Sequence, residues 1–363
     1  MHLIVDSHLD LAWNALLMNR DLTLPLAELN AREASSTDAA GRGRATTVLP
    51  EMRRGGVCLC LGTLVAGASS LGGAARFTFS TVEIANSIAV GQWNYYQRLA
   101  AAGQVRLIST AKELTKHVGE WKAATDEQRA VLPVGIIVAF EGCDSITVPD
   151  EAAVWFDRGV RCASLVHYGH GRYAGGTGTE APLTALGKDL LAEFQRLGVI
   201  LDVTHLSDRA LIDVLAAYDG PLFASHQNCR ALVPRGRQFT DEQLRAVIDR
   251  SGVLGVACDN WMLLAEWPAQ SAGGARPPRD AVPISKLADH IDHICQVAGN
   301  SRHAAIGSDL DGGFGTEQAP HGLDSIADLQ KLDAILTDRG YSSDDVASIL
   351  GGNWIRFFQE HLP

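Results

Sequence analysis

The stretch VILDVTHLSDRALIDVLAAYDGPLFASH, residues 199–226, indicates how this chain folds. It holds two short aliphatic runs, at 199–204 and 221–225, separated by an amphipathic segment at 207–217. Ser207 stands at the start of that segment as a helix N-cap residue. Near-continuous apolar runs joined by a helix are typical of parallel strands that are covered on both faces. The stretch therefore predicts a strand, a crossover helix and a second, parallel strand.

The same pattern recurs along the rest of the chain. Six more aliphatic runs are LIVDS at 3–7, VCLCLGTLV at 57–65, VGIIVAF at 134–140, CASLV at 162–166, VLGVAC at 253–258 and AAIGS at 304–308. Further amphipathic segments lie at 184–197, 240–250 and 285–298, and Thr240 with Gln243 forms a capping-box pattern. Eight alternating strand and helix units predict an α/β fold of the (β/α)8 TIM-barrel type.

The length of 363 residues fits either two domains or one barrel with insertions. We find no internal repeat and no linker of changed composition, which favours a single domain over residues 1–363. Segments rich in Gly, Ala, Arg, Ser or Pro are expected to be inserted loops at the top of the barrel; they are 19–56, 66–82 and 262–284. Residues 343–362 predict a C-terminal helix, broken at Gly351-Gly352, that docks on the barrel.

Composition and charge exclude several classes of protein. With 31 Lys and Arg against 42 Asp and Glu, the net charge is −11, which argues against a nucleic-acid partner. The sequence has neither a membrane-length apolar run nor an export leader at its N-terminus, so we expect no membrane partner. The seven scattered cysteines indicate reduced thiols, and we expect a cytoplasmic protein. The oligomeric state stays open, and a homo-oligomer is one option.

Polar side chains follow most of the predicted strands. In a (β/α)8 barrel, the chemistry lies at the carboxyl ends of the strands. The residues found there are His8 and Asp10 after the first run, Glu141 after the third, His167 after the fourth, His205 after the fifth, His226 after the sixth and Asp309 after the eighth. Any one of them alone is more often a structural residue. Burying all of them on one rim without partners would be costly, and bound cations would remove that cost.

The spacing of these residues predicts a centre with two metal ions. His8 and Asp10 lie two residues apart, so on an extended strand both point to the same side. His205 and His226 end consecutive strands and could hold a second ion. Glu141 could bridge the two ions, and both sites would keep open positions of the kind found in catalytic zinc centres. The imidazoles favour zinc, with Mn, Co or Fe as alternatives.

With these residues in this order, the sequence resembles the membrane (renal-type) dipeptidase family, a group of zinc metallopeptidases with an amidohydrolase-like barrel. The resemblance runs in order from about residue 3 to residue 357. The strings that carry it are DSHLDLAW, VAFEGCDSI, GVRCASLVH, LTALGKDLLAEFQRLGVILDVTHLS, ASHQNCRAL, RQFTDEQLRAV, LADHIDHICQVAG, IGSDLDGG and ILGGNW. It implies a binuclear zinc centre and the hydrolysis of dipeptides by a metal-activated hydroxide, often with tolerance of a D-residue at the C-terminal position.

The resemblance also implies roles for individual residues. The metal ligands would be His8, Asp10, Glu141, His205 and His226, with Glu141 as the bridge. His167 matches the histidine that contacts substrate and steadies the oxyanion. Arg237 matches the arginine that binds the substrate α-carboxylate, although Arg235 is two residues away and could compete for this role. Asp309 matches the acid that holds the water and carries its proton, and Asp311 is interpreted as structural.

The sequence departs from the family pattern after the seventh strand, where many members carry an aromatic residue. This chain has Cys258-Asp259-Asn260-Trp261 there, and we expect Asp259 to contact a basic or polar N-terminal side chain of the substrate. The alternative enzymatic function is an amidohydrolase acting on N-acyl amino acids, lactams or lactones. A catalytically silent metal-binding barrel is a third hypothesis, which the presence of Asp309 beside a complete ligand set argues against.

Overall fold

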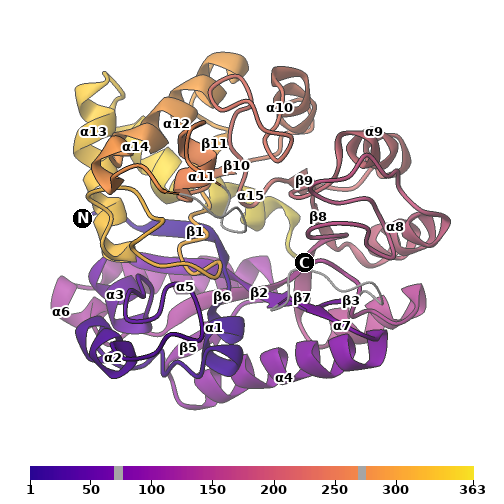
Figure 1. Ribbon diagram of the computed structural model, residues 1–363, viewed down its shortest axis with the longest axis horizontal. Helices are drawn as coiled ribbons and strands as arrows, with labels where there is room; N and C mark the ends of the chain where they lie inside the picture. The colour runs from indigo at the N-terminus through magenta and orange to yellow at the C-terminus, as the bar shows by residue number, and fades with distance from the viewer. Residues whose placement is uncertain (69–76, 269–274) are drawn as a thin grey trace.

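The computed structural model describes residues 1–68, 77–268 and 275–363, and its centre is a parallel β-barrel. The main path of the sheet follows the strand order β10-β11-β1-β2-β6-β7-β8-β9 (Figure 1). These strands are β1 (Ile4–Leu9), β2 (Val57–Val65), β6 (Val134–Glu141), β7 (Val160–Ser164), β8 (Ile200–Asp202), β9 (Leu222–Phe223), β10 (Leu254–Val256) and β11 (Ala304–Ile306). A parallel bridge between Ala224 and Leu254 connects the two ends of this order. The eight predicted strands and the (β/α)8 fold class are confirmed.

The structure adds three short strands that the apolar pattern did not predict. β5 (Val105–Leu107) pairs with the first residues of β6, outside the barrel path. β3 (Gly67–Ala68) and β4 (Thr78–Phe79) pair with each other. None of the three shows an aliphatic run of the kind that marks the barrel strands, because Arg106 interrupts β5 and because β3 and β4 contain Gly67 and Thr78.

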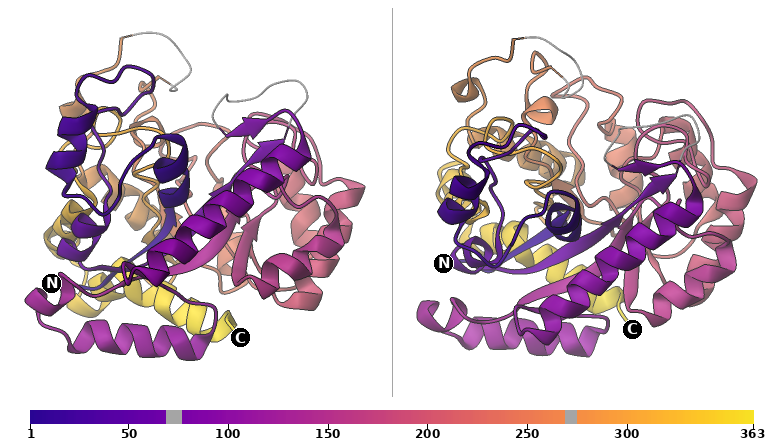
Figure 2. Two further views of the ribbon diagram at one scale, coloured as in Figure 1. Left: turned by 90° about the horizontal axis from the view of Figure 1, so that it is seen from below. Right: turned by 60° about the horizontal axis from the view of Figure 1, so that its bottom comes forward.

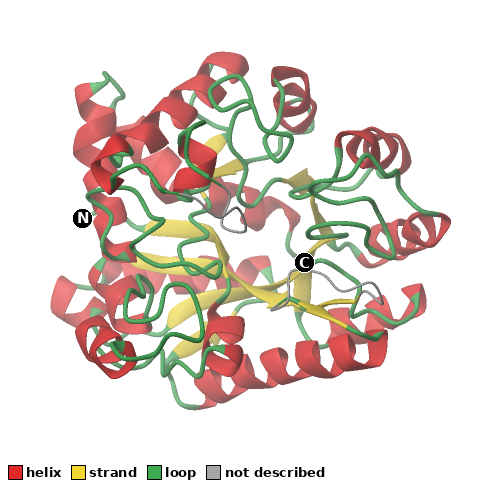
Figure 3. Cartoon of the chain, viewed as in Figure 1, coloured by secondary structure: helices red, strands yellow, loops and turns green. Residues whose placement is uncertain are grey.

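Helices surround the strands on the outside of the barrel, as the red and yellow elements of Figure 3 show. They are α1 (Leu11–Leu17), α2 (Leu26–Glu33), α3 (Leu49–Arg54), α4 (Val82–Ala101), α5 (Ala111–Ala123), α6 (Asp126–Arg129), α7 (Ala152–Asp157), α8 (Ala185–Leu197), α9 (Asp208–Ala217), α10 (Asp241–Ile248), α11 (Asn260–Leu263), α12 (Ser285–Ala298), α13 (Leu332–Asp338), α14 (Ser343–Ala347) and α15 (Asn353–His361). Short 3-10 turns lie at Pro149–Glu151, Arg279–Ala281 and Ile326–Lys331. Within the described residues, no helix has both the length and the apolar character needed to cross a bilayer.

The helix starts that were predicted from capping residues are confirmed. The Ser207 side chain accepts a hydrogen bond from the backbone N–H of Ala210 at the start of α9. At the start of α10, Thr240 and Gln243 form the complete capping box. Of the predicted insertions, 19–56 contains α2 and α3. The segments 66–82 and 262–284 include residues 69–76 and 269–274, which lie outside the described residues.

The C-terminal helix docks on the barrel as expected, but the predicted break at Gly351-Gly352 is wrong. A single π-helical turn, Ser348–Gly352, carries the chain from α14 into α15 without a break. A Cβ at Gly351 would lie 2.6 Å from the carbonyl oxygen of Leu3, so the glycine allows this turn to pack closely on the start of β1. The indole of Trp354 donates to the carbonyl of Ile306, and α15 crosses the amino-terminal end of the barrel beside α5 (Figure 2).

Candidate functional site

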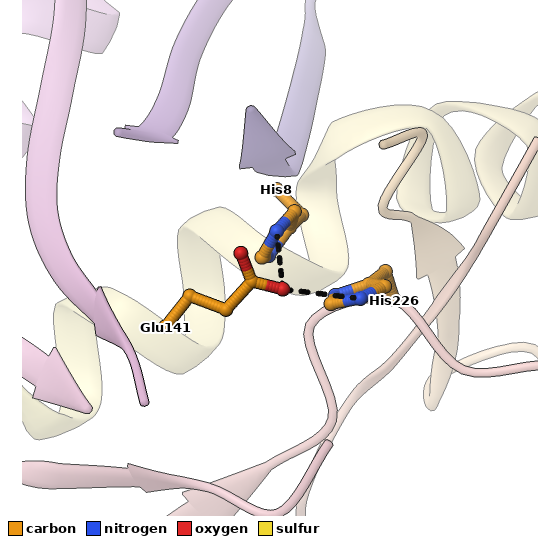
Figure 4. Close-up of side chains that lie close together, drawn as sticks. All are labelled: His8, Glu141 and His226. Carbon is orange, nitrogen blue, oxygen red and sulfur yellow. Dashed lines mark ion pairs between the residues drawn. The ribbon is translucent and has the colours of Figure 1, made fainter. Parts of the chain in front are cut away.

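One carboxylate at the carboxyl end of the barrel lies among four histidines. Oε1 of Glu141 is 3.3 Å from Nε2 of His8 and of His205, 3.5 Å from Nε2 of His167 and 3.7 Å from Nε2 of His226. Figure 4 shows Glu141 at the end of its strand with its carboxylate directed between the rings of His8 and His226. Residues up to 218 positions apart in the sequence meet here because each one lies at or just beyond the carboxyl end of a parallel strand of the same barrel.

Asp10 and Asp309 lie beside His8 at the same end of the barrel. Oδ1 of Asp10 is 3.8 Å from Nε2 of His8 and accepts a hydrogen bond from the Thr63 hydroxyl. Ligand atoms of His8, Asp10 and Asp309 all lie within 4.8 Å of one another. Asp311 accepts a hydrogen bond from the backbone N–H of Asp10 through Oδ1, at 2.9 Å, which fits its structural interpretation.

Within the described part of the chain, three overlapping groups of side chains could each hold a metal ion. They are His8, Glu141 and His226; Glu141, His167 and His205; and His8, Asp10 and Asp309. All five predicted ligands belong to these groups. The groups also include His167 and Asp309, which were not predicted as ligands. These groups differ from the two predicted ion sites, in which His8 and His226 belong to different ions. The difference arises because Oε1 of Glu141 lies near all four imidazoles.

The donor set fits a bound cation. Among the described residues, Nε2 of His8 and Oε2 of Glu141 are buried without a hydrogen-bond partner. Buried polar atoms without partners carry a large desolvation cost, which metal coordination would remove. A mixture of imidazole and carboxylate ligands suits zinc and the neighbouring transition metals better than magnesium or calcium.

Burial also shifts the titration of the site. Burial, together with the nearby Glu141 carboxylate, raises the pKa of Asp10 and the pKa of Asp309 well above the ordinary aspartate value. Burial, together with the Arg237 guanidinium, lowers the pKa of His205 well below the ordinary histidine value. Both shifts have the same physical origin, since charge is unfavourable in a site that bulk water does not solvate.

Two site residues adopt left-handed backbone conformations that are uncommon for residues other than glycine. The φ angle is 69° at His205 and 53° at Asp309. A Cβ at Gly312 would lie 2.1 Å from Oδ1 of Asp309, so a side chain at this position would displace the carboxylate. Backbone strain of this kind is concentrated at functional sites, where the surrounding structure holds it in place.

The structure separates the two candidate arginines. Arg237 is buried, lines the site cavity and donates through Nη2 to the carbonyl of His226 at 2.8 Å. Its Nη1 donates to Oε1 of Gln227 at 2.7 Å. Arg235 instead donates to two carbonyls of the 265–267 segment and lies over the Trp261 ring, with its guanidinium carbon 4.9 Å from the ring centroid. Of the two arginines, Arg237 is therefore the one that lines the cavity.

The cavity above the cluster has a volume of about 260 Å³. Its apolar lining consists of Phe77, Trp261, Met262 and Phe314, and Tyr168 and Gln318 add polar groups. The sequence analysis missed these lining residues, apart from Trp261 in the CDNW string. Tyr168 directly follows His167 and could have been found by position. Phe314 and Gln318 lie in an irregular loop where no periodic pattern points to the cavity.

Asp259 also lines the cavity, but its carboxylate already has partners. It caps α11 by accepting from the backbone N–H of Trp261 at 2.8 Å. Its two oxygens also accept from Nε2 of Gln318, at 3.0 and 3.1 Å. Burial raises the pKa of Asp259 to about 6.

Comparison with known proteins identifies the family. The sequence profile described as "Membrane dipeptidase (Peptidase family M19)" matches residues 1–361. The "Dipeptidase aclJ" of Aspergillus oryzae is 33% identical over 211 residues, which cover 56% of this chain and 46% of that protein. The "Uncharacterized protein in pqqA 5'region" of Klebsiella pneumoniae is 34% identical over 187 residues, covering 52% of this chain and 64% of that protein. The matched regions thus span about half to two thirds of the length of these curated relatives.

Solved structures share the fold over nearly the whole chain. A metallopeptidase from Rhodobacter sphaeroides, liganded with a phosphinate mimic of the dipeptide L-Ala-D-Ala, superposes with a TM-score of 0.75 at 23% identity, covering 100% of this chain and 99% of that one. The "probable dipeptidase PvdM" from Pseudomonas aeruginosa gives a TM-score of 0.74 at 20% identity, covering 99% and 96%. At these identities the likeness concerns the fold. The profile match over residues 1–361 carries the assignment, and this chain belongs to the membrane dipeptidase family, peptidase family M19.

Proposed function

We propose that this chain is a metal-dependent dipeptidase that hydrolyses the peptide bond of dipeptides, with L-D dipeptides among its substrates. The observation that carries the proposal is the position of Glu141, whose Oε1 lies 3.3–3.7 Å from four imidazole nitrogens at the rim of the barrel. Membership of the M19 family supports the reaction class. The Rhodobacter sphaeroides structure was liganded with an L-Ala-D-Ala mimic, which supports including D-residues among the substrates to be tested.

The cofactor we propose is a pair of zinc ions bridged by Glu141. His8 and Asp10 would complete one site, and His205 and His226 would complete the other. When bound, two such ions supply an activated water at neutral pH and polarise the scissile carbonyl. The open positions of the two sites would face the cavity of about 260 Å³, a volume suited to a small substrate.

The remaining site residues bind the substrate and move a proton. Arg237 would hold the substrate α-carboxylate by two charge-assisted hydrogen bonds. His167, whose ring centroid lies 4.5 Å from that of His205, would donate a hydrogen bond to the developing oxyanion. Asp309, whose carboxylate belongs to the group with His8 and Asp10, would carry the proton of the water to the departing amine.

Asp259 is proposed to contact the N-terminal part of the substrate. It lines the same cavity as Arg237, and an acidic side chain there would favour a cationic or polar group. The hydrogen bonds from Gln318 hold its carboxylate in position.

The location we propose is the cytoplasm, since all seven cysteines are buried thiols without disulfides, as in proteins of reducing compartments.

A substrate screen with zinc-loaded protein tests this function. The panel holds L-L and L-D dipeptides, the same dipeptides acetylated at the N-terminus, N-acyl amino acids, lactams and lactones. A dipeptidase hydrolyses the free dipeptides and loses most activity when the amine is acetylated. Preference for the acylated compounds, the lactams or the lactones would instead identify the amidohydrolase alternative.

A further inference from the structure

A single hydroxyl group contacts two of the candidate ligand histidines on the side away from Glu141. Oγ of Ser225 lies 3.2 Å from Nδ1 of His8 and 2.9 Å from Nδ1 of His226. The centroids of these two imidazole rings are 3.8 Å apart, although His8 lies near the end of β1 and His226 follows β9. Their Nε2 atoms lie 3.3 and 3.7 Å from Oε1 of Glu141.

The hydrogen bonds around Ser225 can all be satisfied in one arrangement. A neutral imidazole that binds a metal through Nε2 carries its proton on Nδ1, so both rings would donate to Oγ of Ser225. A hydroxyl oxygen has two lone pairs and accepts both bonds. Its own proton then goes to Oγ1 of Thr204, which lies 3.3 Å away. The arrangement orients Nε2 of His8 and of His226 toward the centre of the site.

The surrounding backbone holds Ser225 in place. Its N–H donates to Oδ1 of Asp202 at 3.0 Å, and the same oxygen accepts from the N–H of Thr204. The Ser7 hydroxyl donates to the carbonyl of Ser225 at 2.5 Å. Ser225 has no solvent-exposed surface, so water cannot easily replace its hydroxyl group.

We propose that Ser225 is a positioning residue shared by the two metal sites, so that one hydroxyl group sets the affinity of both. This inference rests on the proposed two-ion centre, in which His8 belongs to one site and His226 to the other. The third ligand histidine offers a contrast, because Nδ1 of His205 has a partner of its own, Oγ1 of Thr177, at 2.9 Å. The Thr177 hydroxyl therefore supports only one site.

The test measures metal affinity by titrating zinc-loaded protein with a chelator, which does not depend on hydrolysis. We expect Ser225→Ala to weaken both binding steps by roughly 10- to 100-fold each, the usual effect of removing a group that orients a metal ligand. The matched control, Thr177→Val, should weaken one step and leave the other within about threefold of the wild type.

A second variant covers the case in which Ser225→Ala does not fold. Ser225→Cys keeps a weaker acceptor at the same position and should give an intermediate loss at both steps. Unchanged constants in the folded Ser225 variant, or a loss confined to one step, would overturn the inference while leaving the two-ion centre intact. Wild-type protein that binds no transition ion would overturn the centre itself and the role of Ser225 with it.

Discussion

Replacing Arg237 with methionine should selectively impair substrates that have a free C-terminal carboxylate. In our account, the buried Arg237 guanidinium forms two charge-assisted hydrogen bonds with that carboxylate. At roughly 1.5–2 kcal/mol for each bond, their loss costs about 3–4 kcal/mol of transition-state stabilisation. Since each 1.4 kcal/mol corresponds to a factor of about ten, kcat/KM should fall by roughly 10²–10³-fold.

The assay compares each dipeptide with its C-terminal amide. The amide lacks the charge that Arg237 recognises, so Arg237→Met should reduce hydrolysis of the free acid far more than hydrolysis of the amide. Arg237 also donates to the carbonyl of His226, and metal content is therefore measured in parallel to separate lost recognition from lost metal.

The matched control is Arg235→Met, which changes an arginine two positions away in the same loop. Arg235 is engaged with the carbonyls of Ala265 and Trp267, so this variant should change the hydrolysis of acids and of amides by the same factor and keep the wild-type preference for the free acid. If Arg235→Met abolishes the preference for the free acid while Arg237→Met retains it, the assignment of Arg237 is refuted.

Three further variants test the proton carrier, the bridge and the response to pH. Asp309→Asn should lower kcat by roughly 10²–10⁴-fold with both ions retained, because the amide cannot carry the proton; near-normal turnover would assign that step elsewhere. Glu141→Gln should lower the zinc content of both sites in metal analysis, since an amide oxygen is a poorer bridging ligand than a carboxylate, and loss of only one ion would contradict the bridge. Burial lowers the pKa of His290, which is 1% exposed, to about 3. Between the folded pKa of about 3 and the unfolded pKa of about 6.5, His290 is protonated in the unfolded chain but neutral in the folded protein. The free energy of unfolding therefore falls as the pH drops through this window. At pH 5 this residue lowers the free energy of unfolding by about 2 kcal/mol. Denaturant titrations at pH 5 and 7.5 should therefore show a difference in unfolding free energy that is about 2 kcal/mol smaller for His290→Gln than for the wild type.

The sequence could predict the barrel because its strands are buried on both faces. Runs such as 57–65 and 134–140 are apolar throughout, and they recur between amphipathic helices. Strand β5 (Val105–Leu107) was missed, since the half-buried, charged Arg106 at its centre interrupts the apolar residues. The turn at Gly351 was misjudged because a glycine pair normally indicates a helix end, whereas here it allows close contact with Leu3.

The candidate metal ligands could be predicted because fold geometry carries them to one place. His8 and Glu141 lie in the last two residues of their strands, His226 follows its strand, and parallel strands of a barrel end on the same rim. Contacts made by single atoms could not be predicted in this way. Examples are the hydrogen bonds of Ser225 to two imidazole rings and the contact of Gln318 with Asp259. They depend on how side chains from distant parts of the sequence are oriented, which no local sequence pattern predicts.

The central claim is that two ions held by this ligand set hydrolyse dipeptides. The most direct measurement adds zinc in steps to metal-free protein and follows hydrolysis of a dipeptide substrate at each step. Our account predicts that activity rises with zinc and reaches its plateau at two equivalents per chain. Full activity at one equivalent would contradict the bridged pair, and the absence of dipeptide hydrolysis at any zinc content would contradict the proposed function.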